Sequence, residues 1–226
     1  MIAIERPSLM LVTDRRRLAP DARTRHEELC ALDIQLDEAI ESGIDFVQVR
    51  ERDLDASLLV TFIRGLVGRA GLTRILVNDR ADVGLAAGAH GVHLRGDSVA
   101  ASRVRAIRDD WIIGRSVHQG DDVRAGSGAA DYLLFGPVFP TLSKGVAQGA
   151  GLAALGTVID QSPLPVFAVG GITPPRAGAC AAAGASGIAA IGVFLPPGRT
   201  PESLGVRQAV HDLRAALHTY CRRPDR

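Results

Sequence analysis

The sequence contains few aromatic residues, almost no net charge and no long hydrophobic run. Aromatic side chains make up 4% of its 226 residues, which favours helices packed on a buried sheet over an aromatic-rich binding platform. A net charge of +1 provides no basic field for a nucleic acid or a membrane surface. No apolar run approaches the roughly 18 residues of a membrane span, and the N-terminus lacks a signal-peptide pattern. We therefore expect a cytoplasmic protein that binds neither nucleic acid nor membrane.

Cysteine and lysine are also scarce. The three cysteines, Cys30, Cys180 and Cys221, lie far apart and form no CxxC or zinc-binding spacing, so we expect reduced structural thiols. Of the 26 basic residues only Lys144 is a lysine, and the other 25 are arginines. A lone lysine in an arginine-biased chain marks either a position that needs a compact, flexible ammonium or drift in a surface loop.

Short β-branched runs alternate with longer helical patterns along nearly the whole chain. The predicted strands are Leu9–Thr13, Phe46–Arg50, Ile75–Asn78, Gly91–Leu94, Ile112–Ser116, Tyr132–Phe135, Val166–Val169 and Gly187–Ile191. The predicted helices lie near residues 29–42, 56–70, 79–87, 98–109, 120–129, 151–161, 174–183 and 201–220. Eight alternating β-then-α units predict a parallel sheet closed into a (β/α)8 TIM barrel. We expect one domain over residues 8–221 and a frayed tail over 222–226.

Two connections have no predicted structure of their own. Residues 14–25 form a charged loop after the first strand, and residues 136–150 form a long loop after the sixth. Loops of this length are uncommon and are often lids or binding loops. The second loop contains Thr141, Leu142, Ser143 and Lys144, whose hydroxyls and ammonium could gather around an anion.

Polar residues or glycines follow most of the predicted strands. The polar ones are Thr13, Asp14, Gln48, Arg50, Asn78, Asp79, His93, Ser116 and His118. The C-terminal ends of the strands hold the active site in such barrels. Strand capping could explain two or three of these residues, but the whole set at one rim favours a site.

The glycines after the seventh and eighth strands indicate a phosphate site. Gly170 and Gly171 follow the seventh strand, and Ile191 and Gly192 follow the eighth, where a short helix could begin. Loops at these two positions often hold a phosphate on backbone N–H groups, and glycine permits the close approach.

Several rim residues allow two interpretations from the sequence alone. Gln48 and Arg50 point the same way on a strand, and with Arg52 they could recognise a heterocycle edge and an anion, or be a solvated strand end. Asp79 could ligate Mg²⁺ or cap the next helix. His93 could be a site residue or a hydrogen-bonded core histidine.

The ordered segments LVTDR, VQVRERD, LVNDRADVGLAAGAHGVHL, IGRSVH, ADYLLFGPVFPTLSK, AVGGITP and GASGIAAIGVF resemble the thiamine phosphate synthase and TenI family. They cover about residues 9–196. The synthase branch joins 4-amino-2-methyl-5-hydroxymethylpyrimidine diphosphate to a thiazole phosphate and releases pyrophosphate with Mg²⁺. The resemblance thus implies phosphorylated small-molecule substrates, and a homo-oligomer is a possible assembly.

The resemblance implies a role for each matching residue. It implies that Gln48, Arg50 and Arg52 hold the pyrimidine diphosphate, with contacts from Asn78, Ser116 and Lys144. From their place at the rim we also expect His93 to bind substrate, and His118 to be catalytic together with Ser116 and Lys144. The resemblance implies that Thr141, Leu142, Ser143, Gly171, Ile191 and Gly192 hold the thiazole phosphate and that Asp79 binds Mg²⁺. Asp97 stands one residue before the family's second metal position, and we expect it to supply the second carboxylate if the loop absorbs the shift. Three positions depart from the family pattern: Arg52 replaces a lysine, Ser98 stands where a second metal-binding aspartate is usual, and Gly192 replaces a serine.

Two alternatives remain beside the synthase. A TenI-type tautomerase would isomerise a carboxythiazole phosphate with His118 as acid and base and without Mg²⁺. A barrel that binds a thiazole or thiamine phosphate without catalysis is the third hypothesis. We favour the synthase because Gln48, Arg50, Asp79 and Lys144 are all present. A sugar-phosphate isomerase would not explain the ordered motifs.

Overall fold

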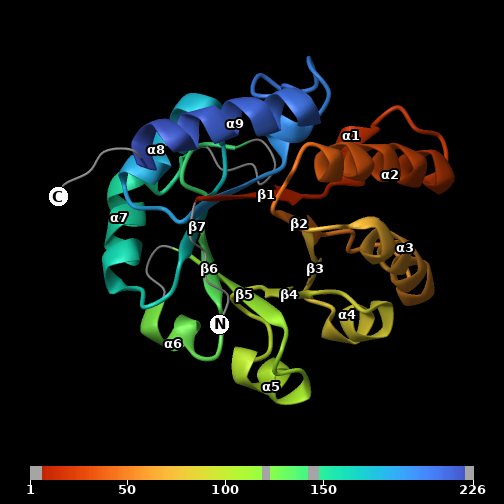
Figure 1. Cartoon of the computed structure of the whole chain (residues 1–226), viewed down its shortest axis with the longest axis horizontal. Coiled ribbons are helices and arrows are strands. Elements are labelled where there is room, and N and C mark those ends of the chain that lie inside the picture. The colour runs from red at the N-terminus through yellow and green to blue at the C-terminus, as the bar shows by residue number, and fades with distance from the viewer. Residues whose placement is uncertain (1–6, 119–122, 142–147, 222–226) are drawn as a thin grey trace.

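Eight short parallel strands pair in sequence order, and the last pairs with the first. The computed structural model describes residues 7–118, 123–141 and 148–221. The strands are β1 (Ser8–Val12), β2 (Phe46–Val49), β3 (Arg74–Asn78), β4 (Gly91–Leu94), β5 (Ile112–Val117), β6 (Tyr132–Phe135), β7 (Val166–Val169) and β8 (Gly187–Ala190). Figure 1 shows this barrel with its helices on the outside. The predicted (β/α)8 barrel is confirmed.

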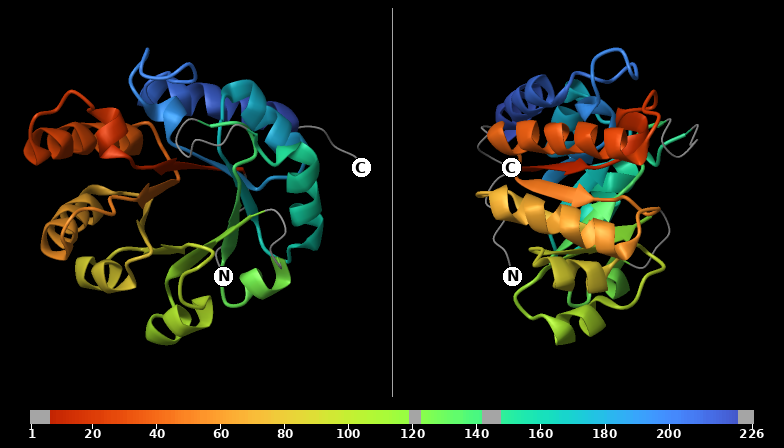
Figure 2. Two further views of the ribbon diagram at one scale, coloured as in Figure 1. Left: turned by 180° about the vertical axis from the view of Figure 1, so that it is seen from behind. Right: turned by 90° about the vertical axis from the view of Figure 1, so that its right-hand side faces the viewer.

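The helices follow the strands as the alternation predicts. They are α1 (Arg15–Leu18), α2 (Arg25–Glu41), α3 (Ala56–Arg69), α4 (Ala81–Ala87), α5 (Ala101–Ile107), α6 (Val123–Ser127), α7 (Gly151–Gln161), α8 (Pro174–Ala182) and α9 (Val206–Cys221). A short 3₁₀ helix, η2 (Gly192–Phe194), follows β8, where the sequence allows a short helix to begin. No helix in the described part of the chain is long and apolar enough to cross a membrane. Figure 2 shows the ring of helices from behind and from the side.

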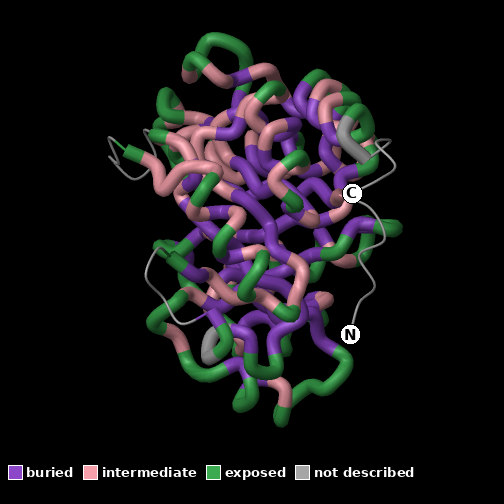
Figure 3. The backbone as a smooth tube through the Cα atoms, turned by 90° about the vertical axis from the view of Figure 1, so that its left-hand side faces the viewer, coloured by how far each residue is buried: buried purple, intermediate pink, exposed green. Residues whose placement is uncertain are grey.

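The strands are buried because they carry apolar side chains on both faces. Outward-facing side chains such as Leu9 and Val47 pack against the helices, and inward-facing ones fill the barrel. The tube in Figure 3 is accordingly buried through the strands and exposed at the outer turns. The few aromatic residues gather inside: the ring of Phe167 lies 5.9 Å from that of Phe46 and 5.1 Å from that of Tyr132.

The segment after β1 differs from its prediction. Residues 14–25 were expected to be a loop, but Arg15–Leu18 forms the short helix α1, with the Asp14 carboxylate accepting a hydrogen bond from the Arg17 amide. Helix α2 also begins earlier than predicted, at Arg25, after an N-cap bond from the Glu27 amide to the Thr24 hydroxyl. Asp14 and Thr24 are common N-cap residues, but the helices were predicted from the spacing of apolar residues, which does not register capping.

Candidate active site

A cavity of about 720 Å³ opens at the C-terminal ends of the strands, and all eight strands or the residues just after them contribute to its wall. Of the predicted site residues, those that line it are Gln48, Arg50, Arg52, Asn78, His93, Asp97, Ser116, His118, Thr141 and Ile191. Parallel strands all end at one rim, so residues distant in the sequence meet there. The predicted location of the site therefore agrees with the cavity.

The remaining predicted site residues lie beside the cavity wall or outside the described residues. Asp79, Gly171 and Gly192 do not line the cavity, although each directly follows a residue that does. Gly171 has φ +62°, and a Cβ there would come within 2.4 Å of the Pro140 carbonyl oxygen, so glycine is required by packing. Leu142, Ser143 and Lys144 fall outside the described residues.

Two arginines that the sequence reasoning did not single out also line the cavity. Arg95 follows β4, and Arg115 lies on β5 beside Ser116. The Arg115 guanidinium donates to the carbonyl oxygens of Gly96 at 2.8 Å and Val99 at 2.9 Å, which ties down the loop after β4. Strand alternation places Arg115 on the face opposite Ser116, so only the length of its side chain brings it back to the site.

Gln48 and Arg50 present polar groups with few partners to the cavity. Gln48 is 2% exposed, and its side chain makes one hydrogen bond among the described residues, a 3.7 Å contact from Nε2 to the weakly accepting sulfur of Met10. The Arg50 guanidinium forms no hydrogen bond or ion pair with the described residues. Burial, and then the nearby Arg52 charge, lowers its pKa. A half-buried cation without a carboxylate partner favours an anionic ligand.

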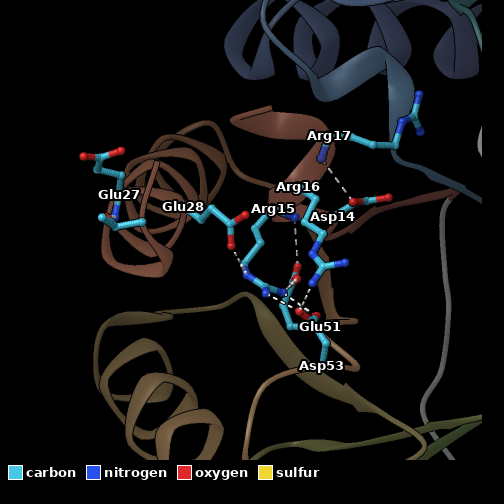
Figure 4. A network of polar contacts seen from close by, with 9 residues as sticks. Asp14, Arg15, Arg16, Arg17, Glu27, Glu28, Glu51 and Asp53 are labelled. Carbon is cyan, nitrogen blue, oxygen red and sulfur yellow. Dashed lines mark hydrogen bonds and ion pairs between the residues drawn. The ribbon is translucent and has the colours of Figure 1, made fainter. Parts of the chain in front are cut away.

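A buried ion network fixes the loop that carries these residues. Arg15 on α1 is 1% exposed and donates to the Glu51 carboxylate at 2.8 Å, to Asp53 and to Glu28 on α2 (Figure 4). The hydrogen bond to Asp53 raises the pKa of Arg15 most and lowers the pKa of Asp53. Since Glu51 stands between Arg50 and Arg52 in the chain, its anchoring sets the position of both arginines.

His93 is a hydrogen-bonded core histidine that also lines the cavity. Its side chain on β4 is 2% exposed, with Nδ1 2.9 Å from the Tyr132 hydroxyl and Nε2 2.8 Å from Ser116 Oγ. Burial lowers the pKa of His93 to about 3, so the ring stays neutral at physiological pH. His90 precedes β4 at the opposite end of the barrel, where its Nδ1 accepts a hydrogen bond from the Ile75 amide, and it is structural.

Asp79 holds an unusual backbone conformation next to the cavity. Its φ is +64°, a left-handed value that aspartate tolerates better than most residues. Its carboxylate accepts a hydrogen bond from Ser98 and lies 3.8 Å from the Arg95 guanidinium. The alternative role as a helix cap is not seen, since α4 begins after Arg80 without a side-chain cap bond.

The residues predicted to hold Mg²⁺ meet at one guanidinium. Arg95 contacts the carboxylate of Asp79 and also pairs with Asp97 through a 3.0 Å bond from Nε. Within the described ranges no group of three or more His, Cys, Asp or Glu side chains gathers. Mg²⁺ is commonly held by one or two carboxylates together with substrate phosphates, so these two carboxylates fit an ion that arrives with a diphosphate. Exposed ion pairs are weak, so a bound cation can displace Arg95 from the two carboxylates.

His118 lies at the cavity wall with a defined ring orientation. Its Nδ1 is 2.7 Å from the Gly136 carbonyl oxygen. A carbonyl only accepts, so Nδ1 carries the proton, and in the neutral ring Nε2 carries the lone pair. Such a nitrogen can accept a proton from a ligand.

The closed parallel barrel and the polar cavity at its C-terminal rim define a protein of the (β/α)8-barrel class. A family model described as thiamine monophosphate synthase matches residues 9–194. The chain belongs to this thiamine phosphate synthase family and is an enzyme of this type.

Individual relatives agree with the family model. A thiamine-phosphate synthase of Azorhizobium caulinodans is 36% identical over 189 residues, covering 81% of this chain and 85% of that protein. One of Anaeromyxobacter dehalogenans is 38% identical over 161 residues, covering 70% and 72%. The solved structure of a thiamine phosphate pyrophosphorylase from Pyrococcus furiosus is 28% identical with a TM-score of 0.75, covering 94% of this chain and 96% of that one.

Proposed function

We propose that this chain condenses 4-amino-2-methyl-5-hydroxymethylpyrimidine diphosphate with a thiazole phosphate to give thiamine phosphate and pyrophosphate, or with its carboxylated form to give the same products and CO2. The observation that carries this proposal is the Arg50 guanidinium, which is half-buried in the cavity without a partner among the described residues and stands beside the Gln48 amide. A diphosphate supplies the missing negative charge, and a pyrimidine edge supplies acceptors for the amide.

The reaction breaks the bond between the pyrimidine methylene carbon and the diphosphate oxygen, and it forms a bond from that carbon to the thiazole nitrogen. Pyrophosphate leaves with both bonding electrons, so positive charge develops on the pyrimidine and negative charge on the leaving group. Arg50 and Arg52 hold the leaving group, with Asn78 as a further contact. Catalysis then rests on positioning and charge neutralisation.

The remaining predicted residues complete the two substrate sites. Thr141, Leu142, Ser143, Gly171, Ile191 and Gly192 hold the thiazole phosphate, while Ser116 and Lys144 contact the diphosphate. We propose Asp79 and Asp97 as carboxylates for Mg²⁺, which when bound neutralises charge on the departing pyrophosphate. Arg95 keeps the two carboxylates neutralised until the diphosphate arrives.

Thiamine phosphate formation tests this function, and Asp79→Asn tests the metal-binding carboxylate. The purified protein with both substrates and Mg²⁺ should release pyrophosphate and form thiamine phosphate. Asn tolerates the left-handed backbone at position 79 but lacks the charge, so we expect activity to fall by about 10²-fold. Asp82→Asn, on the exposed side of α4, is the control and should leave the rate unchanged.

The outcomes separate the claims. A wild-type protein that makes no thiamine phosphate would contradict the synthase function. Product formation at the wild-type rate by Asp79→Asn would remove that carboxylate from the mechanism and leave the function intact. Binding of thiamine phosphate without turnover of either substrate would instead support a non-catalytic barrel.

Tautomerase activity is a second candidate because of the Nε2 lone pair on His118, set by the bond from Nδ1 to the Gly136 carbonyl. If His118 moves the proton of a carboxythiazole phosphate, His118→Asn should lower isomerisation by about 10²–10⁴-fold, since the Asn amide can keep the bond to Gly136 but cannot accept a proton. NMR of the thiazole substrate in D₂O measures the isomerisation through the exchange of the transferred proton for deuterium. Unchanged isomerisation in this variant would exclude the role.

A further inference from the structure

Three polar side chains form a chain of hydrogen bonds from the barrel centre to the cavity. Tyr132 on β6, His93 on β4 and Ser116 on β5 supply the groups, and β5 lies between the other two strands. The Tyr132 hydroxyl is 2.9 Å from His93 Nδ1, and His93 Nε2 is 2.8 Å from Ser116 Oγ. His93 and Ser116 line the cavity, whereas Tyr132 lies deeper.

The buried end of this series, Tyr132, determines which group donates in each hydrogen bond. The Tyr132 side chain is among the largest fully buried ones, and its hydroxyl has His93 Nδ1 as its one hydrogen-bond partner within the described residues. Burial raises the pKa of Tyr132, so the phenol keeps its proton. A buried hydroxyl proton without an acceptor would carry the full desolvation penalty. Tyr132 therefore donates to Nδ1.

The donor and the acceptor in the second hydrogen bond, between His93 and Ser116, follow from the first. A neutral imidazole has one N–H, and since Nδ1 accepts from Tyr132, the proton is on Nε2. Nε2 then donates to Ser116 Oγ. Among the described residues Ser116 makes no other side-chain hydrogen bond, so its own hydroxyl proton is available to a group in the cavity.

We propose that Tyr132 and His93 are positioning residues that orient Ser116 as a hydrogen-bond donor to an anionic phosphoryl oxygen of the substrate. The identity of that ligand rests on the proposed function, but the assignment of donor and acceptor in each hydrogen bond does not. The Ser116–His93 pair is thus not a nucleophile with its base, because the nitrogen that faces Ser116 already holds a proton.

A glycine in β5 makes room for this arrangement. A Cβ at Gly114 would come within 2.0 Å of the Tyr132 ring, so any larger residue there would push the ring away. Gly114 is the cross-strand neighbour of both His93 and Tyr132 in the barrel register. The space that Gly114 leaves lets the Tyr132 hydroxyl reach across β5 to the imidazole.

The tautomer of His93 tests the direction without any ligand. In the ¹⁵N-labelled wild-type protein, long-range ¹H–¹⁵N spectra should show His93 with its proton on Nε2, with the signal assigned by its loss in His93→Gln. Tyr132→Phe removes the hydroxyl that donates to Nδ1, so a second population of His93 with the proton on Nδ1 should appear. A wild-type His93 with its proton on Nδ1 would overturn the proposal.

Binding of inorganic pyrophosphate with Mg²⁺, measured by calorimetry, tests the donor. Ser116→Ala should bind about tenfold more weakly than wild type, because it loses a hydrogen bond to a charged group. Ser116→Thr keeps the hydroxyl and should restore most of the affinity. Tyr132→Phe should weaken binding by about threefold, since part of the population then has the serine proton turned toward His93.

Ser127→Ala is the matched control for pyrophosphate binding. Ser127 is a buried serine of α6 whose hydroxyl donates to the Val123 carbonyl, and it does not line the cavity, so its variant should bind like wild type. Unchanged affinity in Ser116→Ala would overturn the donor role while leaving the synthase proposal in place. A wild-type protein that does not bind pyrophosphate would count against the proposed function. The His93 tautomer would still show which groups donate in the two hydrogen bonds.

Discussion

Arg15→Leu is expected to lower the free energy of unfolding by about 3–5 kcal/mol, the usual cost of removing one partner from a buried ion pair. Arg15 is 1% exposed, and the Glu51 side chain opposite it is 3% exposed. Without Arg15, the Glu51 carboxylate would be a buried charge with no ion-pair partner among the described residues. Urea unfolding followed by circular dichroism measures the change.

Arg16→Leu provides the matched control for this loss. Arg16 follows Arg15 in the same short helix and contacts the same Asp53, but its side chain is 68% exposed. The free energy should therefore change by less than about 0.5 kcal/mol. Adding Glu51→Leu to Arg15→Leu should recover part of the loss, because no unpaired buried charge remains. A single Arg15→Leu variant as stable as the Arg16 control would contradict the role of the network.

The difference between wild type and Arg15→Leu should also depend on pH. The hydrogen bond from Arg15 holds the pKa of Asp53 below its usual value, so the folded protein favours the ionised carboxylate. This stabilisation is present above the unfolded pKa of about 4 and is lost as the pH falls through the folded pKa. The two proteins should therefore approach each other in stability below about pH 4.

Arg50→Met is expected to lower kcat/KM for the pyrimidine diphosphate by about 10²–10³-fold, the range for losing one charged donor at a developing anion. Methionine keeps much of the apolar stem and removes the charge. Because the guanidinium is half-buried without a partner among the described residues, its loss should not lower the free energy of unfolding. Steady-state rates of pyrophosphate release and urea unfolding measure the two effects.

Arg103→Met is the control for the loss of a positive charge. Arg103 is exposed on α5, where it does not line the cavity, so both activity and stability should remain at wild-type values. A variant at position 50 with wild-type kcat/KM would contradict the anion-binding role. Loss of activity accompanied by loss of stability would mean that Arg50 supports the fold rather than the substrate.

Sequence periodicity predicted the strands well and the helix starts less well. Three strands, Gly91–Leu94, Tyr132–Phe135 and Val166–Val169, have their predicted bounds, and the others differ by one residue at one or both ends. A buried parallel strand is a short apolar run with clear ends, which makes it easy to locate. Helix starts depend on capping bonds such as those of Asp14 and Thr24, which leave no mark on hydrophobic periodicity.

The position of the site was also predictable, but several of its contacts were not. Polar residues at strand ends had to meet because parallel strands share one C-terminal rim. Arg95 and Arg115 were missed because long side chains reach the cavity from a loop and from the outer face of a strand. The contact of Arg95 with both Asp79 and Asp97 likewise depends on how the loop after β4 folds.

By itself the sequence determined the barrel, its rim of polar residues and its family, because each is written in local patterns or ordered motifs. Only the tertiary structure decided which polar groups pair. Tyr132 and His93 are 39 positions apart, and Arg15 and Glu51 are 36 apart, yet each pair is in direct contact. The direction of a hydrogen bond and the partner of a buried charge depend on burial and distance, which the closed barrel creates and no short stretch of sequence contains.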